Sequence, residues 1–307
     1  MAKFEYRERY PSKEIDIFTD IRIDKISKLK GMMSKLIKDG VFVYKSSHEE
    51  EKDIYDEFQE ISDSLGLNPI KDASRRKKIR INEKKQRLSS VDLDYAHVNP
   101  HSETSFSPAR PALIAFVCLD ISTAAANHGM TTLVDGEAIW KQLNISTKAY
   151  IANVLISYQL SIDTGMKKKY NLSERDWHLD YSCIKNTKIN YREGKISFEY
   201  LTPYVNEHPI TRKPAIANHS FIDLITEPQI ISREQFKIEN SNLVKIKIPT
   251  IINDCIHHEI KTFKWKKGLS IFIDNFRYMH GRLPYDMSLK RNVFIKQYRN
   301  LNLLLEK

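Results

Sequence analysis

Residues 271–282 have the sequence IFIDNFRYMHGR, in which a short apolar segment leads through a polar turn to a single histidine. The apolar segment starts at Leu269 and ends at Ile273, and the turn contains Asp274 and Asn275. A short apolar run bounded by turn residues is typical of a buried strand. His280 follows this strand and turn and is a candidate metal ligand.

Further strands separated by polar loops are predicted on both sides of this stretch. Strand-like segments occur at 41–44, 113–119, 131–134, 156–162, 196–201, 243–248 and 293–298. Apolar residues at helical spacing predict helices at 24–39, 50–65 and 136–143. Many short strands, with helices mostly near the N-terminus, indicate a mainly β fold with a helical flank, a β-sandwich of the jelly-roll type.

The domain organisation follows from what the chain lacks. No repeat, low-complexity tract or Gly/Ser/Pro linker divides the sequence, so a single domain over residues 1–307 is predicted. Residues 171–254 have weaker periodicity and more charge. We expect an insertion of loops and short elements there, which in an enzyme is often a lid.

Composition excludes several classes of protein. An apolar fraction of 41% and a charged fraction of 29% are those of a globular chain, not a disordered or fibrous one. The longest apolar run is Ala112 to Leu119, whereas a membrane-spanning helix needs about 20 residues. The N-terminus has no apolar signal region, and the three cysteines form no CxxC motif. These features predict a cytoplasmic protein in a reducing compartment.

The chain carries 49 basic and 39 acidic residues, a net charge of +10. Residues 74–88 contain a dense group of basic side chains. This segment lacks the aromatic residues that stack on bases, which argues against nucleic acid as a partner. It is predicted to be a solvated loop or strand edge, with docking of an acidic partner as the alternative.

A second candidate metal motif is the tripeptide His101-Ser102-Glu103. On a strand, residues two apart point to the same face, so the imidazole and the carboxylate can reach one ion. With His280 they would form the two-histidine, one-carboxylate set of non-haem Fe(II) oxygenases. Arg291 begins the predicted strand at 293–298 and could bind a carboxylate bidentately if that strand returned beside His280.

Other polar residues have weaker claims to a site. His97 could support His101 from outside the ligand set, and His219 could contact a substrate. His257 and His258 are adjacent on a predicted helix and do not share a face, which argues against joint metal binding. Arg282 could line a pocket or form a salt bridge. The tryptophans are expected to serve packing; they are Trp140, Trp177 and Trp265.

Together, several segments resemble the TauD/TfdA family of taurine dioxygenase and clavaminate synthase-like oxygenases. The matching segments are LIKDGVFV at 36–43, HSETSFSP at 101–108, NHGMTTLVDG at 127–136, EHPITRKP at 207–214 and the 274–282 stretch. They occur in the family's order and span roughly residues 30 to 300. The resemblance implies a double-stranded β-helix, the jelly roll, and an enzyme that uses Fe(II), 2-oxoglutarate and O₂.

The resemblance also implies roles for individual residues. His101, Glu103 and His280 would bind iron, Arg291 would pair with the distal carboxylate of 2-oxoglutarate, and Thr131 would hydrogen-bond this co-substrate. The sequence departs from the family's pattern at two positions near Thr131: His128 replaces a usual glycine and Met130 a usual acidic residue.

Two further positions bear on the chemistry. The carboxylate ligand is glutamate, as in the clavaminate synthase branch, whereas related halogenases carry a small residue there. In taurine dioxygenase, an arginine four residues after the oxoglutarate arginine holds the sulfonate, and here that position is Ile295. The enzyme is therefore predicted to be an oxygenase that rejects taurine.

The implied reaction is hydroxylation of an unactivated C–H bond in an amino acid or an amino-acid-derived natural-product intermediate. The substrate is a small molecule, either free or tethered to a carrier protein. Desaturation at the same iron is the alternative within enzymes. A non-catalytic basic jelly-roll binding protein is the alternative outside them. Neither the substrate nor the oligomeric state follows from the sequence.

Overall fold

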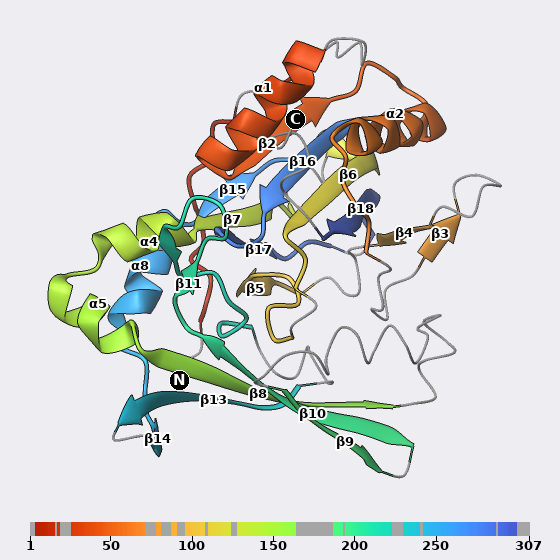
Figure 1. Ribbon diagram of the computed structural model, residues 1–307. Coiled ribbons are helices and arrows are strands. Elements are labelled where there is room, and N and C mark those ends of the chain that lie inside the picture. Colours follow the sequence, from red (N-terminus) through yellow and green to blue (C-terminus); the bar gives the residue numbers. More distant parts are fainter. Residues whose placement is uncertain are drawn as a thin grey trace.

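The computed structural model describes residues 4–15, 17–18, 26–70, 78–80, 87–90, 96–107, 110–123, 128–163, 187–192, 194–222, 230–239, 242–286 and 288–299. Within these ranges the strands form a large sheet, two smaller ones and a short two-stranded ribbon, with helices on their outer sides (Figure 1). None of the described helices is long and apolar enough to cross a membrane.

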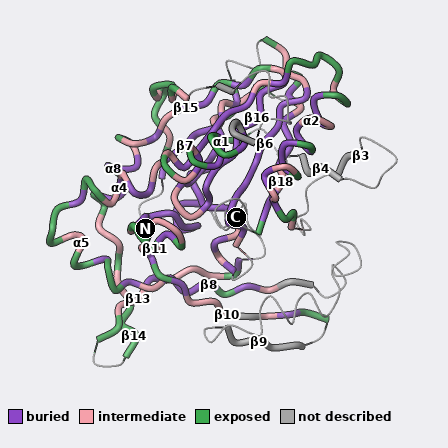
Figure 2. Tube along the Cα trace, turned by 45° about the horizontal axis from the view of Figure 1, so that its top comes forward, coloured by how far each residue is buried: buried purple, intermediate pink, exposed green. Residues whose placement is uncertain are grey.

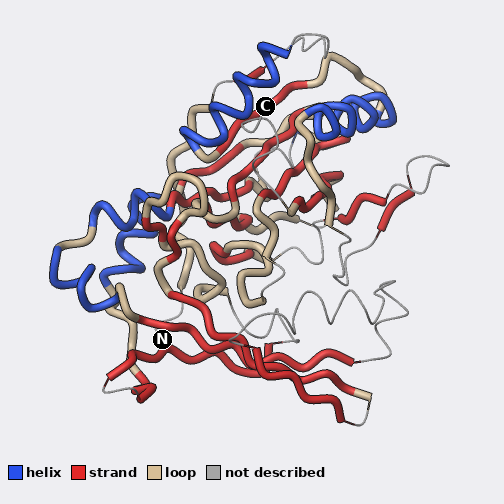
Figure 3. The backbone as a smooth tube through the Cα atoms, viewed as in Figure 1, coloured by secondary structure: helices blue, strands red, loops and turns tan. Residues whose placement is uncertain are grey.

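The largest sheet has seven strands, with helices on one face. In spatial order they are β1 (Ile17–Phe18), β2 (Val41–Lys45), β16 (Leu269–Asp274), β6 (Leu113–Ile121), β18 (Arg291–Tyr298), β4 (Arg87–Ser90) and β3 (Lys78–Arg80). Only the β1–β2 pair is parallel among these described pairings. Helices α1 (Ile26–Asp39) and α2 (Glu51–Ser64) pack on the outer face, as Figure 3 also shows.

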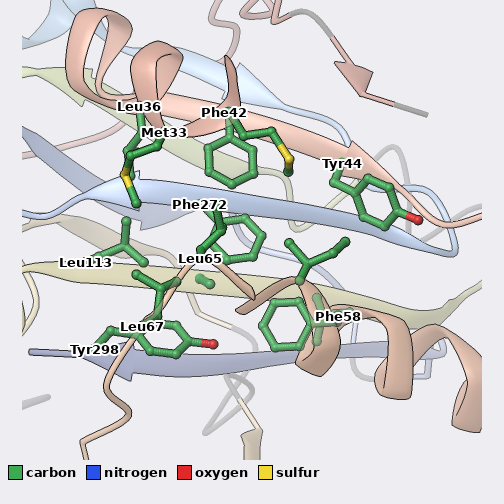
Figure 4. Close-up of a cluster of buried hydrophobic side chains, with 14 of the residues drawn as sticks. Met33, Leu36, Phe42, Tyr44, Phe58, Leu65, Leu67, Leu113, Phe272 and Tyr298 are labelled. Carbon is green, nitrogen blue, oxygen red and sulfur yellow. The ribbon is translucent and has the colours of Figure 1, made fainter. Parts of the chain in front are cut away.

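The helices are held to this sheet by an apolar cluster. Phe42 and Phe272, from neighbouring strands, stack with ring centroids 4.5 Å apart, and Met33, Leu36 and Phe58 of the helices pack against the same cluster (Figure 4). Burial of such side chains contributes about 1.5–3 kcal/mol each. The helical flank is therefore part of the core.

A four-stranded antiparallel sheet faces the inner side of the seven-stranded one. Its order is β15 (Lys261–Phe263), β7 (Thr131–Asp135), β17 (Tyr278–Arg282) and β5 (Val98–His101). Between the two sheets lies a second apolar cluster, to which Phe116, Leu133 and Ile295 belong. These two packed sheets, antiparallel except for the β1–β2 pair, form the predicted jelly roll.

A third sheet lies below the other two in Figure 1. Its five antiparallel strands are, in order, β14 (Asn242–Lys245), β13 (Ile230–Glu239), β8 (Val154–Asp163), β10 (Lys195–Pro203) and β9 (Thr187–Arg192). A third apolar cluster joins it to α4 (Gly136–Gln142), α5 (Ile145–Ile151) and α8 (Ile251–Glu259). The short ribbon pairs β11 (Asn206–Glu207) with β12 (Pro214–Ala215).

Most elements predicted from periodicity are confirmed within one to three residues, but the region 171–254 differs. Besides the predicted strands at 196–201 and 243–248, loops and short elements were expected there, whereas β13 is a ten-residue strand and β10 is nine residues long. Strand β13 is only partly buried, and the polar run Ser232-Arg233-Glu234-Gln235 interrupts its apolar residues, so the strand was not predicted. The basic segment 74–88 lies largely outside the described residues, as does Trp177.

Burial is highest where the two facing sheets meet (Figure 2). Asp135, at the end of β7, caps α4 by accepting hydrogen bonds from the amides of Glu137 and Ala138. Its carboxylate also pairs with Arg277 at 2.6 Å. Arg277 belongs to the turn before His280, so this ion pair ties the helix to the turn that leads into β17.

Candidate metal centre

Two histidines meet because of the register of neighbouring strands. His280 of β17 lies directly opposite His101 of β5. Directly opposite residues on antiparallel strands share a face, with their Cβ atoms about 4.5–5.5 Å apart. The two rings have centroids 4.4 Å apart and a tilt of 45°. Both side chains are buried.

Glu103 completes the group. Its Oε2 atom lies 3.6 Å from His101 Nε2 and 3.7 Å from His280 Nε2. This is the one group of three or more potential metal ligands found among the described residues, with all ligand atoms within 4.8 Å of one another. The three residues predicted from sequence are therefore brought together.

The local backbone at Glu103 differs from the prediction. Strand β5 ends at His101, and Glu103 lies in the following turn, where Thr104 has a φ of 53°. The expected same-face geometry of a continuous strand is therefore wrong. The convergence depends instead on Asn275, whose amide accepts from the Glu103 N–H at 2.8 Å and donates to the Glu103 carbonyl at 3.0 Å.

The tautomer of His101 suits a metal ligand. Its Nδ1 lies 2.9 Å from the Asn99 carbonyl oxygen, which can only accept a hydrogen bond, so Nδ1 carries the proton. The Nε2 lone pair then faces Glu103 and His280. Metal-binding histidines commonly have such a partner on the other ring nitrogen.

The turn at 207–214 supports the same centre from outside. His208 Nδ1 accepts hydrogen bonds from the amides of Ile210 and Thr211, so Nε2 donates to Asp274 Oδ2 at 2.5 Å. Asp274 ends β16 and precedes Asn275, the residue that holds Glu103. This segment therefore contributes by fixing the turn and not by supplying a ligand.

Arg291 and Thr131 lie on the walls that face one another. Thr131 and Leu133 are two residues apart on β7, and Leu133 is opposite His280. Thr131 Oγ1 accepts a hydrogen bond from the Trp265 indole at 2.9 Å. Arg291 is buried at the start of β18, which lies in the facing sheet. The expectation that this strand returns beside the His280 strand is wrong; it returns opposite.

Tyr285 closes the space around two buried arginines. Its ring centroid is 5.5 Å from the Arg291 guanidinium carbon and 5.0 Å from that of Arg282. Arg282 also donates to the carbonyl of Ala96 at 2.7 Å. Burial raises the pKa of the Cys118 thiol to about 12, and the charge of Arg291 acts in the opposite direction. Arg291 is thus a buried positive charge in this part of the barrel.

The other histidines differ in whether they contact the three candidate ligands. The His219 ring is 5.0 Å from that of His101, and burial lowers its pKa well below the usual value. His97 contacts the Tyr6 ring at 5.5 Å, and His257 stacks on Phe4 at 4.4 Å. His258 is largely exposed. Only His219 among these four contacts the ligand group.

Two residues near the site were not predicted from the sequence. Gln297 donates from Nε2 to Glu103 Oε1 at 3.0 Å, and Tyr6 donates to the Val98 carbonyl at 2.5 Å beside Gly281, the residue after His280. Gln297 is six residues after Arg291 (297 − 291). That even spacing on one strand was the available clue, because alternate residues share a face.

The donor set fits a non-haem iron site. Two imidazole nitrogens and one carboxylate oxygen converge from one side, and such a set leaves coordination positions for other ligands. Bonds of about 2.0–2.2 Å to nitrogen or oxygen place neighbouring ligands roughly 3 Å apart. The observed 3.6 and 3.7 Å separations are close to that spacing.

Comparisons with known structures agree with this fold. The chain superposes on a crystal structure of AAD-2 in complex with Mn(II) and N-oxalylglycine with a TM-score of 0.55 and 13% identity, covering 96% of this chain and 97% of that one. It superposes on a taurine dioxygenase from Burkholderia xenovorans with a TM-score of 0.55 and 10% identity, covering 94% and 87%. At these identities the likeness shows the fold. No curated protein sequence matches the chain.

The sequence itself supplies the family. Residues 27–295 match the model described as "Taurine catabolism dioxygenase TauD, TfdA family", a span that includes every residue of the site described above except Tyr6 and Gln297. The chain belongs to the TauD/TfdA family and is an Fe(II)/2-oxoglutarate-dependent dioxygenase.

Proposed function

We propose that this dioxygenase hydroxylates an unactivated C–H bond of an amino acid or an amino-acid-derived natural-product intermediate. In this proposal His101, Glu103 and His280 hold Fe(II), while Arg291 and Thr131 bind 2-oxoglutarate. One observation carries it: two histidines in direct register and one carboxylate converge in a buried space between the sheets.

Each residue has a definite task. The bound iron supplies O₂ activation, coupled to oxidative decarboxylation of 2-oxoglutarate. Arg291 offers a planar fork that matches a carboxylate. Trp265 donates to Thr131 Oγ1, which leaves the threonine proton available for an acceptor such as the co-substrate. The apolar cluster between the sheets keeps water from the reacting groups.

The substrate side is supported by apolar contacts. Ile295 is buried and pairs in register with Phe116, whose ring is 5.3 Å from that of His280. A sulfonate would be costly to bury unpaired against Ile295. Glu103 in place of aspartate is the feature shared with the clavaminate synthase branch. These features favour a substrate that places carbon near Ile295.

We also propose one domain over residues 1–307, with part of 171–254 acting as a lid. Two contacts of this region support the lid: the Ser102 N–H donates to the Asn218 carbonyl at 3.0 Å, and Asn99 donates to the Phe221 carbonyl at 3.1 Å. The net charge of +10 suits an acidic carrier domain that presents a tethered substrate. A cytoplasmic location completes the proposal.

The experiment that tests the reaction is a substrate screen by mass spectrometry. The iron-loaded enzyme is incubated with 2-oxoglutarate and a library of free and carrier-linked amino acids and of small molecules that are not amino acids. Hydroxylation adds about 16 mass units and desaturation removes about 2, so the two outcomes at the same iron are separated. Products from non-amino-acid substrates alone would overturn the substrate class.

A further inference from the structure

The two oxygens of the Glu103 carboxylate have different surroundings. Oε2 faces His101 and His280 at 3.6 and 3.7 Å. Oε1 accepts a hydrogen bond from Gln297 Nε2 at 3.0 Å. We propose that Gln297 is a positioning residue that fixes which oxygen of Glu103 is offered to the metal. This inference rests on the proposed role of Glu103 as a ligand.

Gln297 is held firmly enough to do this. It lies on β18 with its backbone paired to Ile114 of β6. Its carbonyl accepts from the Ile70 amide at 2.8 Å. The residues on either side have the opposite orientation, since Lys296 bonds to Gln59 of α2 and Tyr298 bonds to Ser62. The Gln297 side chain therefore projects toward the space between the sheets.

The chemistry of the amide suits the task. An ionised carboxylate only accepts hydrogen bonds, and a neutral amide donates without adding a charge that would compete with the metal. A carboxylate with both oxygens free to turn can bind a metal through one oxygen or through both. Holding Oε1 aside keeps a single oxygen directed at the metal and leaves other positions open for co-substrate and O₂.

The pairing also gives a reason for glutamate at position 103. Aspartate is shorter by one methylene, so with the backbone of residue 103 fixed by Asn275 its carboxylate would fall short of Gln297. Glu103 and Gln297 are thus expected to act as a unit. Changing Gln297 and Glu103 together should weaken metal binding little more than changing either one, which is the signature of coupled residues.

The test is a double-mutant cycle read by metal affinity, without turnover. Mn(II) binding is measured by calorimetry for the wild type, Gln297→Met, Glu103→Asp and the double variant. Gln297→Met keeps the volume and removes the donor. Loss of a partner that orients a ligand typically weakens metal binding by about 10–100-fold. We expect this for Gln297→Met, and a much smaller effect of the same change in the Glu103→Asp background.

Two controls keep the outcome clear. Gln235→Met removes an equally buried amide (both are 7% exposed) in the five-stranded sheet, and it should leave Mn(II) affinity unchanged. Gln297→Asn keeps an amide on a side chain too short to reach Glu103. It serves as the second variant if Gln297→Met folds poorly, and the same 10–100-fold loss of Mn(II) affinity is expected for it. Wild-type Mn(II) affinity in folded Gln297→Met or Gln297→Asn would overturn the inference. Wild-type affinity in Glu103→Ala would instead overturn the role of Glu103.

Discussion

Replacing Arg291 by lysine should weaken the binding of 2-oxoglutarate and leave metal binding intact. Arg291 is buried at the start of β18, with the Tyr285 ring 5.5 Å away. The guanidinium fork can donate two parallel hydrogen bonds to one carboxylate, whereas an ammonium is a point charge that cannot reproduce this geometry. Because lysine keeps the positive charge, any loss of 2-oxoglutarate binding reports the missing two-bond geometry of the guanidinium.

The size of the effect follows from one lost hydrogen bond. Hydrogen bonds to charged groups contribute about 1.5–3 kcal/mol. At about 1.4 kcal/mol per factor of ten, losing one raises the apparent KM for 2-oxoglutarate roughly tenfold to a hundredfold. The assay is succinate formation at varied 2-oxoglutarate. Arg299→Lys is the matched control, because Arg299 lies just beyond the same strand and is exposed.

An unchanged KM in Arg291→Lys would refute this reasoning. The co-substrate carboxylate would then have another partner. Lys290 is a poor candidate, because it is largely exposed and pairs with Asp120. Arg282 would be the first alternative, since it is buried and shares the Tyr285 ring with Arg291.

Three further outcomes are expected. Taurine with 2-oxoglutarate should release no sulfite, because Ile295 offers no hydrogen bond to a sulfonate; efficient release would mean that an arginine such as Arg282 or Arg212 binds the sulfonate. Supplying chloride and substrate should give no chlorinated product by mass spectrometry, because Glu103 occupies the position where halogenases leave room for chloride. A chlorinated product would contradict the oxygenase assignment. Gly281→Ala should lower metal affinity at least tenfold. An added Cβ would lie 2.7 Å from Thr132 Oγ1 and closer still to the Val98 carbonyl and Tyr6 hydroxyl, so β17 would have to shift. Unchanged Mn(II) binding would show that β17 can shift without moving His280.

Much of the fold was accessible from sequence because its signals are local. The apolar periodicity of α1 and α2 marks their extent, and Gly40 and Gly66 follow the helices with φ values of 75° and 66°. Strand β6 begins with the continuous apolar run 113–119, and β16 is apolar except for Ser270 and Asp274. Helix α5 was missed because Ile151 is its one buried residue, so its sequence has no apolar periodicity and the cap at Asn144 is its main signal.

The site likewise contains residues that the sequence predicts and residues whose role depends on contacts between distant segments. The candidate ligands His101, Glu103 and His280 were predicted because their motifs occur together with the other family segments and in the family's order. Gln297 was not, because its contact depends on β18 facing the turn after β5, and no local pattern encodes that pairing. The turn at Thr104 was missed for a related reason: Asn275, 171 residues later (275 − 104), determines its shape.

The most direct test of the central claim is metal binding by the wild type and by His101→Ala, Glu103→Ala and His280→Ala, with circular dichroism to confirm folding. The wild type should bind one Mn(II) and, with Fe(II), form succinate from 2-oxoglutarate. Each variant should lose at least a hundredfold in metal affinity and lose succinate formation, at modest cost to stability. Near-normal metal binding and turnover in His280→Ala would contradict the claim and would direct attention to His219 as the third ligand.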